Sequence, residues 1–205
     1  MNIQVFNQAS IKFSGAKIIY FDPYKLPIEK HDADLIFITH DHYDHYEEES
    51  IKKTMIENTM LVVPTILKEQ ASKLTNNLLV VEPNKVYTID DITFETIPSY
   101  NEAAPYHPND KLYVGYNVNI NGTKYYIMGD TDRTPEADKV KTDICFVPIG
   151  GTYTMNVDEA IDYINELKPK KVIPIHYGSI VGDISLGNDF KDRINKEIEV
   201  EILIK

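Results

Sequence analysis

The sequence predicts an α/β fold in which helices pack on mixed β-sheets, and two observations lead to this prediction. In the first and last thirds of the chain, short apolar runs typical of buried strands alternate with helical segments. In the middle third, residues 92–97 alternate in period two, and Asn121-Gly122 separates two β-type runs, which is a strong hairpin signal. We therefore expect parallel and antiparallel strand pairs in a single domain that spans residues 1–205.

The elements of the first third follow from local patterns. Residues 1–22 form short strands, and Asp22-Pro23 ends the last of them. The apolar run 35–38 is a buried strand, and the acidic residues of 47–50 open a helix where the helix dipole favours them. Because proline is tolerated in the first turn of a helix, Pro64 separates the next elements: a strand at 60–63, a helix at 65–74 and a strand at 78–81.

The rest of the chain continues this alternation after the central hairpin. The hairpin strands cover 112–120 and 124–128, and the long polar loop 98–111 that precedes them has the length of a functional loop. Asn156 is a helix cap with Glu159 three residues further on. The predicted order is a strand at 144–149, a helix at 156–167, a strand at 171–175, a helix at 189–196 and a strand at 198–204.

Composition indicates an ordinary globular protein of the cytoplasm. Hydrophobic residues make up 42% of the 205 residues and charged residues 26%. No apolar run approaches the roughly 18 residues of a membrane span, and the first residues lack a secretory pattern. The single cysteine, Cys145, fits a reducing compartment and lies in an apolar run as a small buried hydrophobe.

Three of the six histidines fall within residues 40–45, directly after the strand at 35–38. In an extended segment His40 and His42 point the same way, whereas the adjacent Asp44 and His45 point apart. Imidazole and carboxylate ligands without thiolate suit Zn, Mn or Fe and leave room for a reactive water. The stretch therefore predicts two metal sites side by side, and His31, in a polar stretch, is left outside them.

This run resembles the His-x-His-x-Asp-His motif of the metallo-β-lactamase superfamily, and further matches follow in the same order along nearly the whole chain. The chain is similar to the small stand-alone metal-dependent hydrolases related to ascorbate-6-phosphate lactonase. The resemblance implies a four-layer αββα sandwich with mixed sheets. It also implies two divalent metal ions as cofactors, Zn first, with Mn or Fe as alternatives.

The resemblance implies further ligands at the ends of two predicted strands. Asp130 corresponds to a carboxylate shared between the metals, and His176 to a histidine of the second metal. A shared carboxylate offsets the repulsion between two cations held about 3.5 to 4 Å apart. Asp22 corresponds to a residue that supports the metal loop by hydrogen bonding, and a turn-initiating Asp before Pro23 is the alternative interpretation.

The chain departs from the pattern at the third histidine of the first metal. Where relatives show Ala-Tyr-His, this chain has Ser99-Tyr100-Asn101, and the nearest histidine is His107. His107 is the expected ligand, but six residues span about 20 Å when extended, so the loop must fold back. The alternatives are that the Asn101 oxygen binds metal or substrate directly, or that the site lacks one ligand.

We expect a hydrolase in which metal-bound hydroxide attacks a carbonyl or phosphoryl centre, with Asp44 as the catalytic residue that orients the nucleophile or accepts a proton. Tyr153 and Tyr177 are expected at the substrate rim. A small ester or lactone is the first substrate class and a small phosphodiester the second. An RNA-processing nuclease of the superfamily, or a metal-binding module without turnover, remains an alternative function.

The net charge of -11 argues against nonspecific binding to nucleic acid or to anionic membranes, because both favour a basic surface. Two bound divalent cations would add about four positive charges at the site. An anionic small molecule is therefore still an acceptable substrate. The sequence leaves the oligomeric state open.

Overall fold

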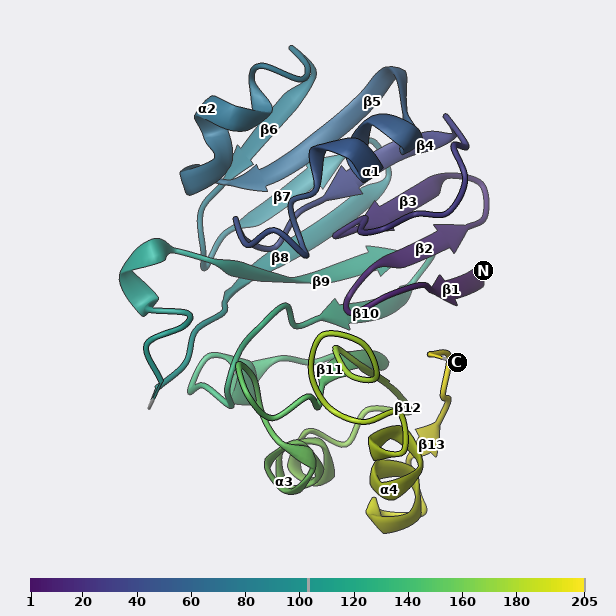
Figure 1. The fold of residues 1–205 in the computed structure, drawn as a ribbon, viewed down its shortest axis with the longest axis vertical. Helices are drawn as coiled ribbons and strands as arrows, with labels where there is room; N and C mark the ends of the chain where they lie inside the picture. Colours follow the sequence, from purple (N-terminus) through teal and green to yellow (C-terminus); the bar gives the residue numbers. More distant parts are fainter. Residues whose placement is uncertain (103, 205) are drawn as a thin grey trace. The chain divides into compact units, whose positions relative to one another are not determined.

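The computed structural model describes residues 1–102 and 104–204, and the chain divides into two compact units, Met1–Glu82 and Pro83–Lys205. Each unit is built around one sheet with both parallel and antiparallel pairs (Figure 1). The predicted α/β class with mixed sheets is confirmed. The single domain over residues 1–205 stays a prediction.

The sheet of the first unit has its strands in sequence order. Its first three strands pair antiparallel, as their short connections require, and from the third strand onward all pairs are parallel. The strands are β1 (Asn2–Val5), β2 (Ile11–Ser14), β3 (Ile18–Phe21), β4 (Ala33–Phe37), β5 (Met55–Pro64) and β6 (Leu78–Val81).

Two short helices, α1 (Glu48–Thr54) and α2 (Lys68–Ala71), pack on one face of this sheet. Ile51 and Ala71 join a buried cluster with strand residues such as Ile36 and Leu61. The predicted helix at 65–74 is shorter, because a 3-10 turn (Thr65–Leu67) precedes it and the Thr75 hydroxyl accepts the Asn77 N–H beyond its end. Such side-chain bonds compete with continued helix.

The parallel pairing of β3, β4 and β5 brings their carboxyl ends to one edge. Phe21, Phe37 and Val62 lie in register at this edge, and the Phe21 and Phe37 rings stack 5.0 Å apart. Asp22 and the loop after β4 therefore leave the sheet next to each other. Edges of this kind, at the carboxyl ends of parallel strands, are where α/β proteins place their sites.

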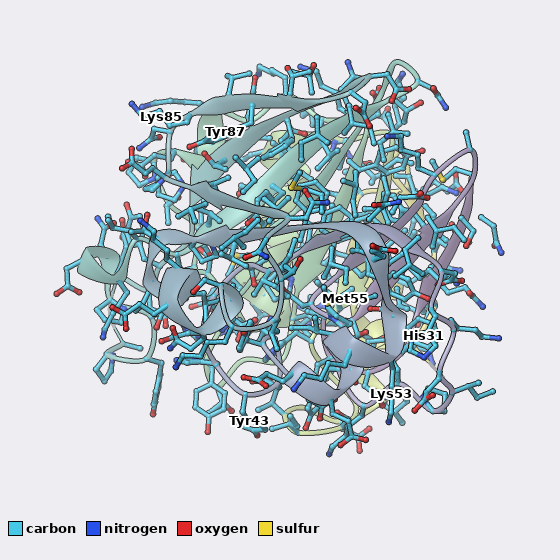
Figure 2. The ribbon with its side chains drawn as sticks, turned by 90° about the horizontal axis from the view of Figure 1, so that it is seen from above. His31, Tyr43, Lys53, Met55, Lys85 and Tyr87 are labelled. Atoms are coloured by element: carbon cyan, nitrogen blue, oxygen red, sulfur yellow. The ribbon has the colours of Figure 1, made fainter. Side chains whose placement is uncertain are left out.

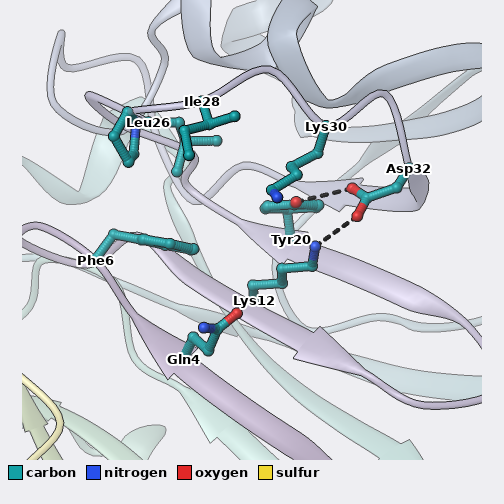
Figure 3. A pocket seen from close by; sticks show the side chains of 9 residues that line it. Gln4, Phe6, Lys12, Tyr20, Leu26, Ile28, Lys30 and Asp32 are labelled. Atoms are coloured by element: carbon teal, nitrogen blue, oxygen red, sulfur yellow. Dashed lines mark hydrogen bonds and ion pairs between the residues drawn. The ribbon is translucent and has the colours of Figure 1, made fainter.

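A cavity of about 260 Å³ lies in the first unit beside the polypeptide that leads into β4. Asp32 binds the Lys12 ammonium at 2.6 Å and accepts the Tyr20 hydroxyl at 2.9 Å (Figure 3). These contacts tie Asp32, the residue before β4, to Lys12 of β2 and Tyr20 of β3, and thereby help to fix where β4 begins.

The second sheet has the order β13-β12-β11-β10-β9-β8-β7. Strands β7 to β10 form an antiparallel meander, and β10 to β13 are parallel. The strand β7 was not predicted, and β13 covers only two residues of the predicted 198–204. The strands are β7 (Val86–Ile89), β8 (Ile92–Pro98), β9 (Val114–Ile120), β10 (Thr123–Ile127), β11 (Ile144–Pro148), β12 (Lys171–Ile175) and β13 (Glu199–Val200).

The helices of the second unit are α3 (Val157–Leu167) and α4 (Leu186–Arg193). The Asn156 cap is confirmed, because its side chain accepts the Glu159 N–H while the Glu159 carboxylate accepts the Asn156 N–H. Helix α4 begins earlier than the predicted residue 189, after a turn in which Asp183 accepts from Ser185. No helix among the described residues is both long enough and apolar enough to cross a membrane.

Candidate metal centre

The loop after β4 gathers three imidazoles and a carboxylate in the first unit. The N–H groups of His45 and Tyr46 both bond to the His42 carbonyl, which folds the loop into a tight turn. The His40 ring lies 4.6 Å from that of His42 and 3.9 Å from that of His45, centroid to centroid. Potential ligand atoms of His40 and His42, of His40 and His45, and of Asp44 and His45 lie within 4.8 Å of each other.

Asp22 and Thr39 fix which nitrogen of two of these rings carries a proton. Asp22 accepts the Thr39 N–H on Oδ1 at 2.8 Å, and the Thr39 hydroxyl on Oδ2 at 2.7 Å. The same Oδ2 lies 2.8 Å from His45 Nδ1, which must therefore donate. Since the Thr39 hydroxyl proton goes to Asp22, its oxygen accepts from His40 Nδ1 at 2.9 Å. In both histidines Nε2 then carries the lone pair that a metal binds.

Two aromatic residues near the cluster in sequence, Tyr43 and His31, are exposed. Tyr43 is 65% exposed. His31, left outside the site on sequence grounds, is exposed, and its Nδ1 lies 3.0 Å from the Met55 carbonyl oxygen. Figure 2 labels the side chains of His31, Met55 and Lys53. The backbone N–H of His31 donates to the Lys53 carbonyl, so this histidine links the β4 approach to the end of α1.

Three residues far apart in sequence meet in the second unit. Asp130 follows β10 after a left-handed Gly129, and His176 follows β12 in a left-handed conformation of its own, with φ 59°. Asp130 Oδ2 lies 3.0 Å from His176 Nε2 and 3.5 Å from His107 Nε2. Asp130, His107 and His176 are all buried, so one carboxylate oxygen faces two imidazole nitrogens away from solvent.

His107 reaches Asp130 because the loop 101–107 folds back on itself. The Asn101 N–H donates to the His107 carbonyl at 2.8 Å, and Asn101 Oδ1 accepts the His107 N–H at 3.1 Å. Asn101 Oδ1 also lies 2.8 Å from His107 Nδ1. If His107 is a ligand, the loop must fold back. Asn101, which stands where a histidine was expected, holds the loop in that folded-back form.

The two predicted rim tyrosines differ. Tyr153 is partly exposed, and its ring packs edge-on against Tyr106 at a centroid distance of 4.7 Å. Tyr177 is fully buried, so the expectation that it faces substrate does not hold. Its ring fills the space above Gly187 of α4, where a Cβ would collide with the Tyr177 hydroxyl. Burial raises the pKa of Tyr177, so this hydroxyl keeps its proton at neutral pH.

The sequence did not single out Thr39, Asp132 or Tyr106. Thr39 immediately precedes the motif, and its position between a strand and the first histidine is a usable signal. Asp132 accepts from the Asn101 amide at 2.9 Å, and Tyr106 neighbours His107. The contacts of Asp132 and Tyr106 depend on the conformation of the loop, which no local sequence pattern predicts.

The chemistry of these residues fits divalent metals. His107 Nε2 and Asp130 Oδ2 are both lone-pair atoms, and at 3.5 Å they are too far apart for a hydrogen bond. In the first unit His45 Nε2 and Asp44 Oδ2 face each other at 3.7 Å in the same way. Two ligands of one tetrahedral ion, each about 2.0–2.2 Å from it, are separated by roughly 3.3–3.6 Å. The His107–Asp130 pair falls within this range, and the His45–Asp44 pair, at 3.7 Å, lies just above it, so a cation between the two acceptors of each pair would offset their repulsion.

Comparison with known proteins agrees with this chemistry. A metal-dependent hydrolase of the UPF0173 group from Thermococcus onnurineus (strain NA1) is 27% identical over 218 residues, covering 99% of this chain and 96% of its own length. A protein of the same description from Staphylococcus aureus (strain bovine RF122) is 28% identical over 217 residues, covering 95% of this chain and 93% of its own.

A solved structure gives the same result. A protein from Parabacteroides distasonis, whose crystal structure is described as that of a metal-dependent hydrolase, has a TM-score of 0.80 and 28% identity. The alignment covers 99% of this chain and 93% of that one. The family profile of the beta-lactamase superfamily domain matches residues 2–176. Because this match covers most of the sequence, the chain belongs to the beta-lactamase superfamily, as the residues of the 40–45 motif predicted.

Proposed function

We propose that this metal-dependent hydrolase of the beta-lactamase superfamily binds two divalent metal ions and cleaves a small ester, lactone or phosphoester. Zn is the proposed metal, with Mn or Fe as alternatives that the same ligands accept. Bound metals of this kind lower the pKa of a coordinated water towards about 7 and polarise the bond under attack. The proposed ligands are His40, His42, Asp44, His45, His107, Asp130 and His176.

The observation that carries this proposal is the pairing of acceptors in each unit. His45 Nε2 faces Asp44 Oδ2, and His107 Nε2 faces Asp130 Oδ2, in both cases as a lone pair towards a carboxylate. The opposite ring nitrogens of His45 and His107 are committed to Asp22 and Asn101. Burial of such pairs costs stability unless a cation or a proton compensates their repulsion. His176 Nε2, 3.0 Å from Asp130 Oδ2, can supply a proton to that carboxylate in the metal-free chain, whereas bound cations would compensate both pairs.

Asp44 is the proposed catalytic residue. Its side chain is nearly buried next to the His45 ring, where the carboxylate would help to hold a metal and could orient a water or accept a proton from it. Replacement by asparagine preserves the shape of this side chain and removes its charge. The proton acceptor is then lost, and the adjacent metal is held less tightly.

For the substrate we propose a small ester or lactone, in keeping with the lactonase-related hydrolases that the sequence resembles. The exposed Tyr106 and Tyr153 rings pack together and give the second unit an apolar surface, and Tyr106 directly precedes the proposed ligand His107 in sequence. Such a surface suits the carbon skeleton of a small organic substrate. A small-molecule phosphodiester is the second proposed class.

The first experiment measures metal identity and stoichiometry by mass spectrometry, on protein purified without added metal and again after reconstitution. The second assays the loaded protein against a panel of simple esters, lactones and phosphodiesters. Asp44→Asn should abolish turnover, whereas Asp41→Asn, in the same loop and with the same change in chemistry, should retain it. Failure to bind metal under any condition contradicts the proposal. Tight metal binding without turnover, and without any response to Asp44→Asn, favours a binding module.

A further inference from the structure

Asn101 uses every hydrogen-bonding position of its side chain. Its Nδ2 group donates to Asp132 Oδ1 at 2.9 Å and to the Tyr153 carbonyl at 3.0 Å. Its Oδ1 accepts the His107 N–H at 3.1 Å and faces His107 Nδ1 at 2.8 Å. A primary amide has two donor hydrogens and two acceptor lone pairs, so this set exhausts its capacity.

The partners determine the orientation of the amide. A carboxylate and a backbone carbonyl can only accept, so the NH₂ group must face Asp132 and Tyr153. The oxygen then faces His107, whose Nδ1 must carry the proton. The lone pair of His107 is consequently on Nε2, the atom that points at Asp130 Oδ2.

We propose that Asn101 is not a metal ligand but the positioning residue for one. It holds His107 in the tautomer and ring orientation that present Nε2 to the metal. The inference rests on the proposed function only in that His107 binds metal. The inference assigns a role to Asn101, which occupies the position where a histidine was expected. The proposed ligand His107 lies six positions further along the chain, and Asn101 orients it.

Asp132, which accepts from the Asn101 amide, is itself held by two further hydrogen bonds. Asp132 Oδ2 accepts the Glu102 N–H at 3.0 Å, and the Asp132 N–H donates to the Tyr100 carbonyl at 3.0 Å. The amide of Asn101 is therefore fixed by the segment after Asp130, which itself carries a proposed ligand. Hydrogen-bond partners of metal-binding histidines typically contribute 10- to 100-fold to metal affinity.

The same amide reaches the proposed substrate surface. One Nδ2 hydrogen holds the Tyr153 carbonyl, and Tyr153 packs on Tyr106, the residue before His107. Loss of the amide thus loosens the ligand and displaces the aromatic pair together. A residue that only filled space would not link these two features.

The test uses the full chain with four variants. Asn101→Ala removes all four bonds. Asn101→Asp keeps the acceptor for His107 but sets a second carboxylate against Asp132. The double variant Asn101→Asp/Asp132→Asn exchanges amide and carboxylate at constant net charge, which restores a donor–acceptor pair between the two positions. The control is Asn117→Ala, which removes a buried amide that bonds to Glu95 and the Lys141 carbonyl.

Two readouts are measured for each variant. Zn²⁺ and Co²⁺ affinities come from competition with a chromogenic chelator, and long-range ¹H–¹⁵N NMR of the metal-free protein reports the His107 tautomer. We expect Asn101→Ala to weaken binding of one metal 10- to 100-fold and to mix the two tautomers. The double variant should recover affinity relative to Asn101→Asp, and Asn117→Ala should match the unmodified protein.

Each alternative result is distinguishable. Wild-type affinity and an unchanged Nδ1–H tautomer in Asn101→Ala would overturn the positioning role. An equal loss in Asn117→Ala would reduce the effect to general destabilisation. His107→Ala serves as the reference: if it too leaves metal affinity unchanged, the proposed ligand set is at fault, whereas the NMR tautomer still tests the Asn101 contact by itself.

Discussion

Asp22 offers the sharpest test of how the first unit prepares its ligands. The side chain is fully buried and accepts three hydrogen bonds, two from Thr39 and one from His45 Nδ1. Asn at this position has nearly the same shape but replaces one acceptor oxygen by a donor. Whichever way the amide turns, an NH₂ group meets either the Thr39 N–H or the hydroxyl and imidazole donors opposite.

The expected cost follows from this mismatch. One buried donor left without an acceptor costs about 1–3 kcal/mol, and weaker bonds to a neutral group raise the total to about 2–3 kcal/mol. For a chain of this length that lowers Tm by roughly 4–12 °C. If the Asp22→Asn substitution shifts the His45 proton from Nδ1 to Nε2, the proposed ligand atom Nε2 loses its lone pair. Metal affinity should then fall about 10- to 100-fold.

The assay combines thermal unfolding of the metal-free protein with chelator competition. Asp32→Asn is the matched control, since Asp32 also holds two partners in the same unit, Lys12 and Tyr20, but contacts no proposed ligand (Figure 3). Asp32→Asn should lower Tm and leave metal affinity unchanged. The reasoning fails if Asp22→Asn binds metal as tightly as the unmodified protein while His45→Ala does not.

Three further predictions concern packing, substrate and metal. Gly187→Ala should lower Tm because the new methyl collides with the Tyr177 hydroxyl and ring, and adding Tyr177→Phe should recover only part of the loss, since the ring carbon Cζ stays 2.8 Å from that methyl; an unchanged Tm in Gly187→Ala would contradict this packing. Tyr106→Ala and Tyr153→Ala should reduce kcat/KM for esters with large apolar groups while metal stoichiometry stays constant, and a uniform loss across all substrates would argue against an aromatic subsite. Finally, reconstitution with metal at 100 times its Kd should stabilise the protein by about 2.7 kcal/mol per site, and an unchanged Tm would show that the metals do not bind the folded chain.

The fold was predictable where the signal is local. The motif loop follows an apolar strand, the Asn121-Gly122 turn has two left-handed residues, and the Asn156 capping box needs only four consecutive positions. Strand β7 was not predicted because alternate residues of it are exposed and the others are only partly buried, which weakens the apolar pattern. Strand β13 is shorter than its apolar sequence, since only Glu199 and Val200 pair with β12.

The sequence predicts candidate ligands for the site, but it could not predict the contacts that support them. The burial of Tyr177 depends on a glycine ten residues later, in another element. The role of Asn101 depends on Asp132 and on the carbonyl of Tyr153, which lie 31 and 52 positions away. A pattern read along the chain records the absence of a histidine at 101, and only the folded loop shows what the asparagine does instead.

The hydrogen bonds that set the histidine tautomers share one feature: they form when the chain folds, before any metal binds. His45 and His40 receive their acceptors, Asp22 and Thr39, from the first unit, and His107 receives Asn101 from the second. The tautomers of these three histidines are therefore set through hydrogen bonds internal to the unit in which each histidine lies. The entropy of ordering these rings is met by folding rather than by metal binding, which preserves affinity. It follows that substitution of a supporting residue in one unit should weaken the ligands of that unit and leave the tautomers of the other unchanged.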